Sequence, residues 1–413
     1  MYLVNIPTFI LLIVRLERNN YSFSKQDKTL FWAITIGLRV FILFFEPLLS
    51  DDIFRYVWDG HIQQFGINPY LHNPDSATLI PYRTSWWTKV NNPNIGTPYP
   101  PFSEFIFFLF FANSLPLNQV IVIYRIGVIF FDIGTIKLVG KLLTLLHQPA
   151  RRVIYYSWSP LVLLEFAGNG HNDVFALFFM MLALYYYLKN EEKSDRRYNY
   201  YVALALSLAI LTKLYPIILL PFVIPRWRLK EIFVFITPFA VLSFIYYIPD
   251  RNVLSSPGLQ LFVRYFEFNS TIFRIVKSIT PGEDTGASTR IFYGVVMFLL
   301  STYYIFQYHR QKDQIGPNLL LVNIGKIFFL SFIFGPDVQP WYILWVFPLA
   351  VIILYRPIIV YSLTIILSYY IYIKYDSSGI WEENEIVLLL EYLPVYLIWL
   401  HDELKQSTNS IQV

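Results

Sequence analysis

The sequence predicts an all-α polytopic membrane protein, and three observations support this fold class. First, 56% of the 413 residues are hydrophobic and 15% are charged, whereas about a quarter of the residues of a soluble domain are charged. Second, the apolar residues fall in long blocks separated by short polar stretches, which is the pattern of successive transmembrane helices. Third, the basic residues gather in alternate loops, as the positive-inside rule expects of a chain that crosses a membrane repeatedly.

The apolar blocks predict about 11 to 13 transmembrane helices. Candidate spans lie near 29–49, 153–168, 173–189, 199–213, 215–225, 231–249, 290–309, 317–335, 341–355, 357–374 and 386–400. The region 100–146 holds one more long span and an extra apolar segment. One of these two is expected to be re-entrant or interfacial, because the chain must cross an odd number of times there. The N-terminal apolar segment lacks the basic region and cleavage site of a signal peptide and is expected to be an interfacial or partial helix.

We expect a single membrane domain over residues 1–413. It comprises a core at 29–250 with a long outer loop at 50–99, an outer loop at 251–289 and a C-terminal set of helices at 290–413. The second loop contains GLQLFVRYFEFNSTIFRIVKSI, whose apolar residues recur at helical spacing. This pattern predicts one amphipathic helix at the membrane interface.

The loops also predict which face of the membrane each one occupies. Placing RLERNNYSFSKQDK, PARR, KNEEKSDRR, PRWRLK, HRQK and YRP in the cytoplasm puts the polar loops 51–99, 168–173, 250–289, 335–342 and 376–385 together on the outer face. No basic arm with interleaved aromatic residues suggests a nucleic-acid site. The sequence has no cysteine, which excludes a thiol nucleophile and a thiolate metal site.

Acidic residues cluster where the first long apolar block ends, in SDDIFRYVWDGHIQQFGINPY. Asp51 and Asp52 are adjacent, so their charges repel, which favours a proton on one of them and suits a general base. Arg55 follows one helical turn later and is placed to bind an anion, and Asp59 lies two turns beyond Asp52. Helix termination and surface solvation are the alternative roles for these acids.

Three further polar stretches interrupt the apolar blocks. In GNGHND, His171 and Asp173 either cap the next helix or hydrogen-bond a sugar or phosphate. Lys213, between two apolar runs, either extends to the interface or binds a phosphate. The third stretch, GPDVQPWYILWVFPL, places polar and aromatic side chains at a membrane entrance, where an interfacial aromatic belt is the alternative to a ligand site.

Metal and nucleotide sites are not predicted. The six histidines are scattered without the close spacing of a zinc site, and two adjacent acids do not by themselves indicate a divalent cation. No glycine-rich phosphate loop is present, so we expect no nucleotide-sugar site and no cofactor.

Taken in order, DDIFRYVWDG with GINPY, TPYPPF, GHND, KLYP and QPWYILWVFPL resemble the motifs of GT-C fold glycosyltransferases that use polyprenyl-phosphate sugars. The resemblance is greatest to bacterial polyprenol-phosphomannose-dependent mannosyltransferases and the GPI mannosyltransferase I group. It covers roughly Ser50 to Pro348, and the C-terminal spans look variable.

This resemblance implies an inverting transferase in the bacterial inner membrane with its active site on the periplasmic face. Its general base is expected on the first outer loop, at Asp52, with Asp51 second. The matching motifs extend the expected substrate and donor-phosphate site to Arg55, Asp59, Tyr99, His171, Asp173, Lys213, Tyr215, Arg264, Gln339, Trp341 and Tyr342. Relatives often carry a histidine where this chain has Gln339. A glutamine donates a hydrogen bond but cannot take up a proton or a positive charge, so either phosphate binding depends on Arg55, Lys213 or a loop residue such as Arg264, or the donor preference differs.

The predicted reaction transfers a sugar, foremost mannose, from a polyprenyl-phosphate donor to a hydroxyl of a lipid-linked or glycan acceptor. Two alternatives remain. A transporter or lipid flippase would show internal repeats and charges spread through many spans, whereas here the polar motifs collect on one face. An O-antigen-type ligase or polymerase would use a polyprenyl-diphosphate donor and would need more cationic charge in its outer loops.

Overall fold

All regular elements of the described residues are helical. The structure is a computed structural model, and it describes residues 2–19, 21, 23–47, 49–247, 257–282 and 284–410. Within that part of the chain, extended pairing is limited to an isolated bridge between Phe268 and Asp337. The helices long and apolar enough to cross a membrane include Leu117–Leu145, Leu229–Tyr246, Thr285–Ile315 and Arg356–Ile373. The prediction of an all-α polytopic membrane protein is therefore confirmed.

Contacts within the chain define two compact units. Unit 1 consists of residues 1–21, 151–161 and 266–413, and unit 2 of residues 22–150 and 162–265. Each unit is described by itself. The single membrane domain over residues 1–413, with its internal boundaries near residues 250 and 289, stays a prediction.

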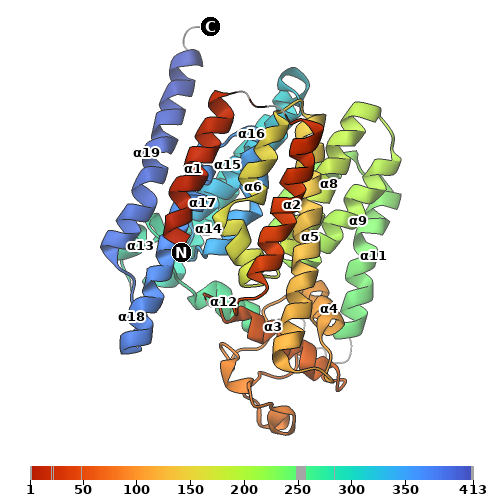
Figure 1. Cartoon of the computed structure of the whole chain (residues 1–413), viewed down its shortest axis with the longest axis vertical. Coiled ribbons are helices and arrows are strands. Elements are labelled where there is room, and N and C mark those ends of the chain that lie inside the picture. Colours follow the sequence, from red (N-terminus) through yellow and green to blue (C-terminus); the bar gives the residue numbers. More distant parts are fainter. Residues whose placement is uncertain are drawn as a thin grey trace. The chain divides into compact units, whose positions relative to one another are not determined.

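Unit 2 holds the long outer loop and most of the predicted core (Figure 1). Its α-helices are α2 (Lys25–Ile42), α3 (Asp52–Gln63), α4 (Pro101–Phe110), α5 (Leu117–Leu145), α8 (Asp173–Lys193), α9 (Arg197–Thr212), α10 (Leu220–Val223), α11 (Leu229–Tyr246) and α12 (Pro257–Tyr265). Its shorter turns are η1 (Ala77–Tyr82), η2 (Trp87–Lys89), the π-helical turn η4 (Leu163–Gly168), η5 (Tyr215–Leu219) and η6 (Ile224–Arg226). Helix α8 packs between α5 and α9, and α11 packs on α9.

The two apolar segments of 100–146 differ in length. Helix α4 has 10 residues, about 15 Å at 1.5 Å per residue, which is half of the ~30 Å hydrocarbon core. Pro100 and Pro101 fix its start, because proline is well tolerated at the first helical position. Helix α5 has 29 residues and is long enough to cross. The chain must cross the membrane an odd number of times over this region, so one of the two segments does not cross. By its length, that segment is α4.

The outer loop is anchored on α3 by an apolar cluster. Trp58 and Ile62 on one face of α3 pack against Leu79 and Val90 of the loop, with tryptophan and tyrosine rings around them. Because these four side chains are buried, the loop is a packed structure that holds its polar residues in place.

Arg125 of α5 fixes the chain on both sides of this region. Its guanidinium donates hydrogen bonds to the carbonyl oxygens of Ile42 and Phe45, where α2 ends, and to Ala167 in the π-helical turn. Helix ends leave carbonyl groups unpaired, and a buried guanidinium supplies the missing donors.

Unit 1 holds the C-terminal helices. They are α1 (Tyr2–Arg18), α6 (Val153–Ser157), α13 (Ile272–Ile279), α14 (Thr285–Ile315), α15 (Asn318–Phe334), η8 (Pro340–Trp345), α16 (Phe347–Ile353), α17 (Arg356–Thr364), η9 (Ile365–Tyr369), α18 (Tyr370–Ser378) and α19 (Glu385–Ser410). The short turns η3 (Ala150–Arg152) and α7 (Pro160–Val162) fall at the boundaries of the two units.

Three predicted elements are wrong as continuous helices. The spans 153–168 and 341–355 are broken into short helical pieces beside Pro160 and Pro348, because a proline within a helix removes a hydrogen bond and clashes with the preceding turn. The single amphipathic helix of the second outer loop is two helices, α12 and α13. They are separated where Asn269 adopts a left-handed φ of 51°. Residues 248–256 of that loop lie outside the described residues.

Candidate active site

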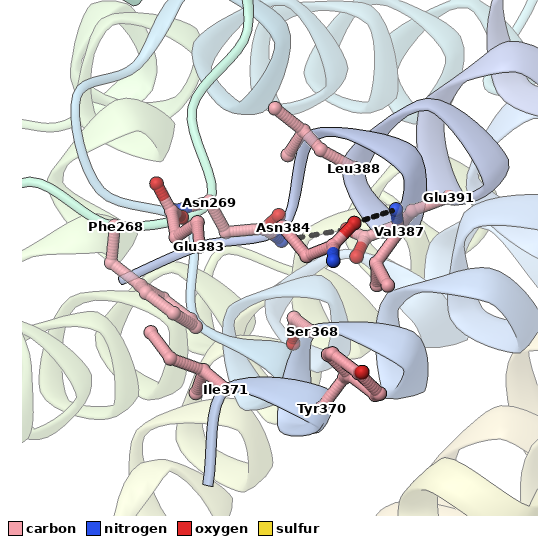
Figure 2. A pocket seen from close by; sticks show the side chains of 10 residues that line it. All are labelled: Phe268, Asn269, Ser368, Tyr370, Ile371, Glu383, Asn384, Val387, Leu388 and Glu391. Carbon is pink, nitrogen blue, oxygen red and sulfur yellow. Dashed lines mark hydrogen bonds between the residues drawn. The ribbon is translucent and has the colours of Figure 1, made fainter. Parts of the chain in front are cut away.

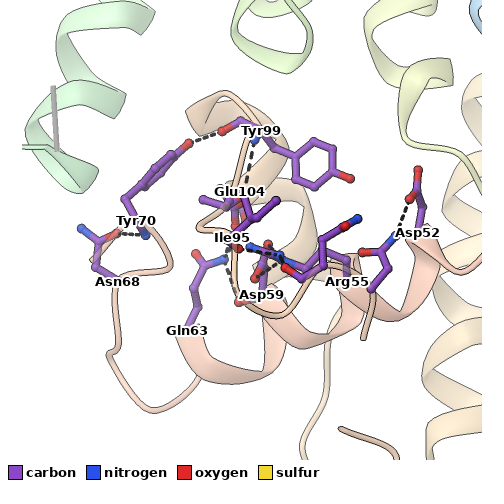
Figure 3. Close-up of polar contacts among 12 residues, drawn as sticks. Asp52, Arg55, Asp59, Gln63, Asn68, Tyr70, Ile95, Tyr99 and Glu104 are labelled. Atoms are coloured by element: carbon purple, nitrogen blue, oxygen red, sulfur yellow. Dashed lines mark hydrogen bonds and ion pairs between the residues drawn. The ribbon is translucent and has the colours of Figure 1, made fainter. Parts of the chain in front are cut away.

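Asp52 is the first residue of α3 and faces a set of hydrogen-bond donors (Figure 3). Asn91 of the outer loop donates from Nδ2 to Asp52 Oδ1 at 2.7 Å and to Asp51 Oδ1 at 2.9 Å. Tyr56, one turn along α3, donates its hydroxyl to Asp52 Oδ2 at 3.4 Å. The side chain of Asp52 keeps 21% of its surface exposed, so its carboxylate is held in place and still reachable.

Asp51 lies just before the helix and is the more exposed of the two acids. Crowding of its carboxylate by surrounding protein and the negative charge of Asp52 raise the pKa of Asp51. The shared Asn91 amide opposes this repulsion by donating to both carboxylates. The structure therefore brings the two acids onto one donor and leaves both near solvent.

A buried histidine and a buried glutamate stand behind Asp52. His171 Nδ1 lies 3.7 Å from Asp52 Oδ2, and His171 Nε2 lies 3.2 Å from Glu165 Oε2. Both His171 and Glu165 are fully buried. Asn169 donates from Nδ2 to the same Glu165 oxygen at 3.0 Å. Asp52, His171 and Glu165 thus form a line from the surface of the site into the interior.

The local fold that builds this line is a π-helical turn followed by a glycine turn. Glu165 lies in η4, and its carbonyl accepts from the backbone N–H of His171 at 3.0 Å. Gly170 has a φ of +75°, a backbone conformation that favours glycine, and a Cβ there would lie 2.9 Å from Ile53 Cδ1, so this turn lies close against α3. Such π-helical turns occur frequently at functional sites.

A second polar group lies where α8 begins and α9 ends. Lys213 Nζ lies 3.4 Å from Asp173 Oδ2, and it also lies over the ring of Tyr99, 5.2 Å from the centroid. The Tyr99 ring contacts the Tyr56 ring edge-on at 5.3 Å, and Tyr56 in turn donates to Asp52. Asp173 is fully buried whereas Lys213 is 18% exposed, so the ammonium group is the accessible member.

These contacts define what we call the Asp52 cluster. Its members are Asp51, Asp52, Tyr56, Tyr99, Glu165, His171, Asp173 and Lys213. Tyr215 lies in η5, just after Lys213, with a half-buried side chain. Sequence reasoning missed Glu165, although a charged residue inside the apolar run SWSPLVLLEFAG was a signal of function. It also missed Asn91, which has no signal in the sequence because only folding of the outer loop brings it to Asp52.

Arg55 and Asp59 form a separate, closed group (Figure 3). Arg55 Nε lies 3.0 Å from Asp59 Oδ2, and both side chains are buried. Nearby, Glu104 accepts hydrogen bonds from Thr97 Oγ1 at 2.6 Å and from Gln63 Nε2 at 3.0 Å. Burial and the charge of Asp59 hold the pKa of Glu104 well above its usual range. The role of Arg55 as a phosphate ligand stays a prediction, and in this structure its guanidinium is engaged by Asp59.

Arg264 is exposed on α12, the helix that leans on the outer loop. Its guanidinium lies 5.3 Å from the Tyr265 ring. Gly258 at the start of α12 is so close to the carbonyl of Gly96 that a Cβ would lie 2.0 Å from that oxygen. A side chain cannot replace this glycine without moving α12 away from the loop.

The late motif forms a cluster of its own within unit 1. Gln339 donates from Nε2 to Asp337 Oδ1 at 2.8 Å, and Tyr342 donates its hydroxyl to Asp337 Oδ2 at 3.2 Å. Burial of this carboxyl raises the pKa of Asp337 to about 7. Trp341 packs edge-on against Tyr342, which stacks on Trp345. Because each unit is described by itself, a shared role with Asp52 stays a prediction for these residues.

Among the residues that the structure describes, no three His, Asp or Glu side chains come together as a metal site. The Asp52 cluster offers instead a reachable carboxylate, a buried histidine next to it and an accessible ammonium group. That combination suits removal of a proton from a hydroxyl and binding of an anion.

The helical membrane fold and the Asp52 cluster define a membrane protein in which carboxylates, an imidazole and an ammonium group lie together in one polar cluster. Residues 3–229, more than half of the chain, match the family model described as alpha-(1→6)-mannopyranosyltransferase, N-terminal domain, and the chain belongs to this family. It is therefore a mannosyltransferase, as the motifs predicted, and the transporter alternative is set aside. A comparison with curated proteins gave no match.

Proposed function

We propose that the protein transfers mannose, with inversion, from a polyprenyl-phosphate donor to a hydroxyl of a lipid-linked or glycan acceptor. The reaction takes place on the outer face of the bacterial inner membrane. The observation that carries this proposal is the position of Asp52. It is a reachable carboxylate at the head of α3, held by Asn91 and Tyr56 and lined up with His171 and Glu165.

In the proposed reaction, Asp52 takes the proton of the acceptor hydroxyl. The acceptor oxygen attacks the anomeric carbon from the side opposite the phosphate, and the bond between that carbon and the phosphate oxygen breaks. The electron pair leaves with the polyprenyl phosphate. Since one in-line displacement inverts the configuration, an α-linked product of the kind in the family's description requires a β-linked donor.

Glu165 and His171 are proposed to position Asp52. Glu165 Oε2 holds the imidazole ring by its contact with Nε2 at 3.2 Å, and Nδ1 of the same ring lies 3.7 Å from Asp52 Oδ2. Because the ring is fully buried and contacts Glu165 on its far side, it limits where the carboxylate of Asp52 can lie. This dyad keeps the carboxylate of Asp52 oriented while the acceptor approaches.

Lys213 is proposed to bind the donor phosphate, with Arg264 as the second cation. Lys213 is partly exposed beside Tyr99 and belongs to the Asp52 cluster. Because a polyprenyl phosphate leaves as a stable anion and these cations compensate its charge, no cofactor is required in this scheme. The aromatic and apolar surroundings suit a lipid-borne donor.

The proposal is tested by incubating the purified protein with radiolabelled polyprenyl-phosphate mannose, glucose or arabinose, and in parallel with GDP-mannose and a polyprenyl-diphosphate sugar. We expect transfer from polyprenyl-phosphate mannose alone, and unchanged transfer when EDTA is added. Transfer only from the diphosphate donor would favour the ligase alternative. Transfer from GDP-mannose would contradict a lipid-borne donor.

A further inference from the structure

The cavity at the start of α19 in unit 1 is small (Figure 2). Asn269 and Glu391 are among the residues that line it, and its volume of about 20 Å³ is room for one water molecule. It therefore takes neither a sugar ring nor a lipid headgroup. The surface of unit 2 carries a larger feature, a row of lysines on the parts of α5 and α8 that lie away from the Asp52 cluster.

These lysines lie against aromatic rings from neighbouring helices. On α5, Lys137 Nζ is 5.9 Å from the centroid of the Trp32 ring of α2. Lys141 Nζ, one turn later, is 5.4 Å from the centroid of the Tyr185 ring of α8. Lys189 Nζ is 5.3 Å from the same Tyr185 centroid. An ammonium group within about 6 Å of a ring centroid is attracted to the ring, so these contacts hold the lysine side chains in a row.

Lys189 extends the row to α9. Its Nζ lies 5.4 Å from the centroid of the Tyr198 ring, and it donates a hydrogen bond to the Tyr185 hydroxyl at 3.2 Å. Four helices therefore contribute to one surface on which lysines and rings alternate. We call this surface the lysine band, and its members are Trp32, Lys137, Lys141, Tyr185, Lys189 and Tyr198.

The lysine band lies near the last turns of α5 and α8. Lys137 lies about 12 Å, and Lys141 about 6 Å, before the end of α5 at a rise of 1.5 Å per residue. Along α8, Lys189 lies about 24 Å from Asp173 of the Asp52 cluster. This separation approaches the ~30 Å thickness of the hydrocarbon core. The lysine band and the Asp52 cluster therefore suit opposite interfaces of the membrane.

The lysine band has no counter-charge within the part of the chain that the structure describes. No aspartate or glutamate there forms an ion pair with Lys137, Lys141 or Lys189. Helix α5 is long and apolar enough to cross a membrane, and a charged side chain within such a helix is costly unless it finds a partner. Lys137 and Lys141 are exposed, so an anion can reach them from the membrane surface.

We propose that the lysine band binds the phosphate groups of anionic phospholipids at the membrane face opposite the Asp52 cluster. Each ammonium group supplies three donors for phosphate oxygens, and the rings between them offer apolar surface to the adjoining acyl chains. Because Lys141 and Lys189 lie against one ring, their charges repel, and an anion between them relieves that repulsion. A net negative lipid suits three uncompensated positive charges better than a zwitterionic lipid does.

The test measures lipid binding to the purified full-length protein in a neutral detergent by native mass spectrometry. Phosphatidylglycerol is the anionic probe, and phosphatidylcholine is the zwitterionic probe. A lysine beside an anionic leaflet contributes about fivefold in affinity. We therefore expect the triple variant Lys137→Gln, Lys141→Gln and Lys189→Gln to bind phosphatidylglycerol about a hundredfold more weakly. Its binding of phosphatidylcholine should stay unchanged.

The matched control removes the same charge from three exposed lysines of α2 and α8 that lie outside the band, in the triple variant Lys25→Gln, Lys28→Gln and Lys193→Gln. It should weaken binding of phosphatidylglycerol by less than about tenfold, because these lysines do not belong to the row that holds the phosphate groups. An equal loss in both triple variants would overturn the band as a site, since it would show a general attraction between charges. Equal binding of the two lipids by the wild-type protein would overturn it as well.

A single variant keeps the test decisive if the triple variant does not fold. Lys141→Gln changes an exposed side chain and should weaken binding of phosphatidylglycerol about fivefold, and binding equal to wild type would overturn the proposal. Inorganic phosphate, added in excess, should leave the bound lipid in place. Displacement of the lipid by inorganic phosphate would show a site for free phosphate and would overturn the lipid as its ligand. All variants leave the Asp52 cluster intact, so the result is independent of the proposed reaction.

Discussion

Two pairs of acidic residues lie along α3, one at its start and one made by Asp59 of α3 with Glu104 of α4, and their surroundings differ. Asp51 and Asp52 lie at the start of the helix, share the Asn91 amide and remain reachable from solvent. Asp59, about two turns further on, is sealed in the interior with Glu104. The first pair faces a histidine, and the second faces a guanidinium.

The difference shows that the surroundings of a carboxylate decide its role. Arg55 compensates the charge of Asp59, and the raised pKa of Glu104 keeps a proton on that second acid, so the buried pair is electrically close to neutral. No lysine or arginine pairs with Asp52 among the described residues, and its neighbours are an amide, a hydroxyl and an imidazole. The buried pair is therefore suited to hold the outer loop, and the open pair is suited to accept a proton.

The largest effect is expected at Asp52. Asp52→Asn keeps the shape of the side chain and removes its basicity, and general-base catalysis contributes about 10²- to 10⁴-fold. We expect kcat for mannosyl transfer to fall by this factor while binding of the donor lipid is retained. Asp51→Asn, measured beside it, should lower kcat less than tenfold, and an equal loss in both variants would mean that the two acids act as one unit.

The next effect concerns the buried pair. Arg55→Met leaves Asp59 and Glu104 without their cation, and breaking a buried pair from one side costs about 3–5 kcal/mol. Thermal unfolding in detergent should show a strongly lowered melting temperature. Arg197→Met removes an arginine whose side chain is 79% exposed and should change it little. A melting temperature of Arg55→Met close to wild type would show that the pair does not hold the loop.

A smaller effect is expected at Glu165. Glu165→Gln removes the charge that orients His171 but keeps the size of the side chain. Because partners of this kind act on the scale of about ten- to a hundredfold, kcat should fall by that amount with KM for the donor unchanged. A parallel rise of KM, or a general loss of folded protein, would identify Glu165 as a merely structural residue.

The smallest effect is expected at Asp337 of unit 1 and concerns how stability depends on pH. The pKa of Asp337 is raised from 3.8 to about 7, so between these values the folded protein holds a proton that the unfolded chain has lost. Stability should therefore fall as the pH rises from about 4 through about 7. Asp337→Asn should flatten this part of the curve of melting temperature against pH, whereas an unchanged curve would show that other groups cause it.

Much of the fold follows from hydropathy. The α8, α9, α11, α14 and α15 helices lie where the apolar blocks predict them, because a long apolar run leaves a membrane chain few alternatives to a helix. The breaks at Pro160 and Pro348 were harder to predict, because a proline within an apolar run changes the mean hydropathy little. The split between α12 and α13 depends on the backbone of Asn269, which its distant partners on α19 enforce.

The residues of the candidate site could also be predicted from the sequence only in part. The motifs gave Asp52, His171, Asp173 and Lys213 as candidates, and the structure brings all four into one cluster. Glu165 is marked in the sequence by its charge within an apolar run, whereas nothing in the sequence marks Asn91. Arg55 seemed available in sequence because its spacing from Asp52 is one turn, but the spacing to Asp59 is also one turn, and the ion pair forms there.

The most direct test compares Asp52→Asn and Asp59→Asn by the rate of mannosyl transfer per folded molecule, with polyprenyl-phosphate mannose as donor. Both variants replace an aspartate of α3 by its amide. The account predicts that folded Asp52→Asn is nearly inactive, whereas Asp59→Asn melts at a lower temperature but its folded fraction transfers within about tenfold of wild type. Near-wild-type turnover by folded Asp52→Asn would contradict the assignment of Asp52 as the base.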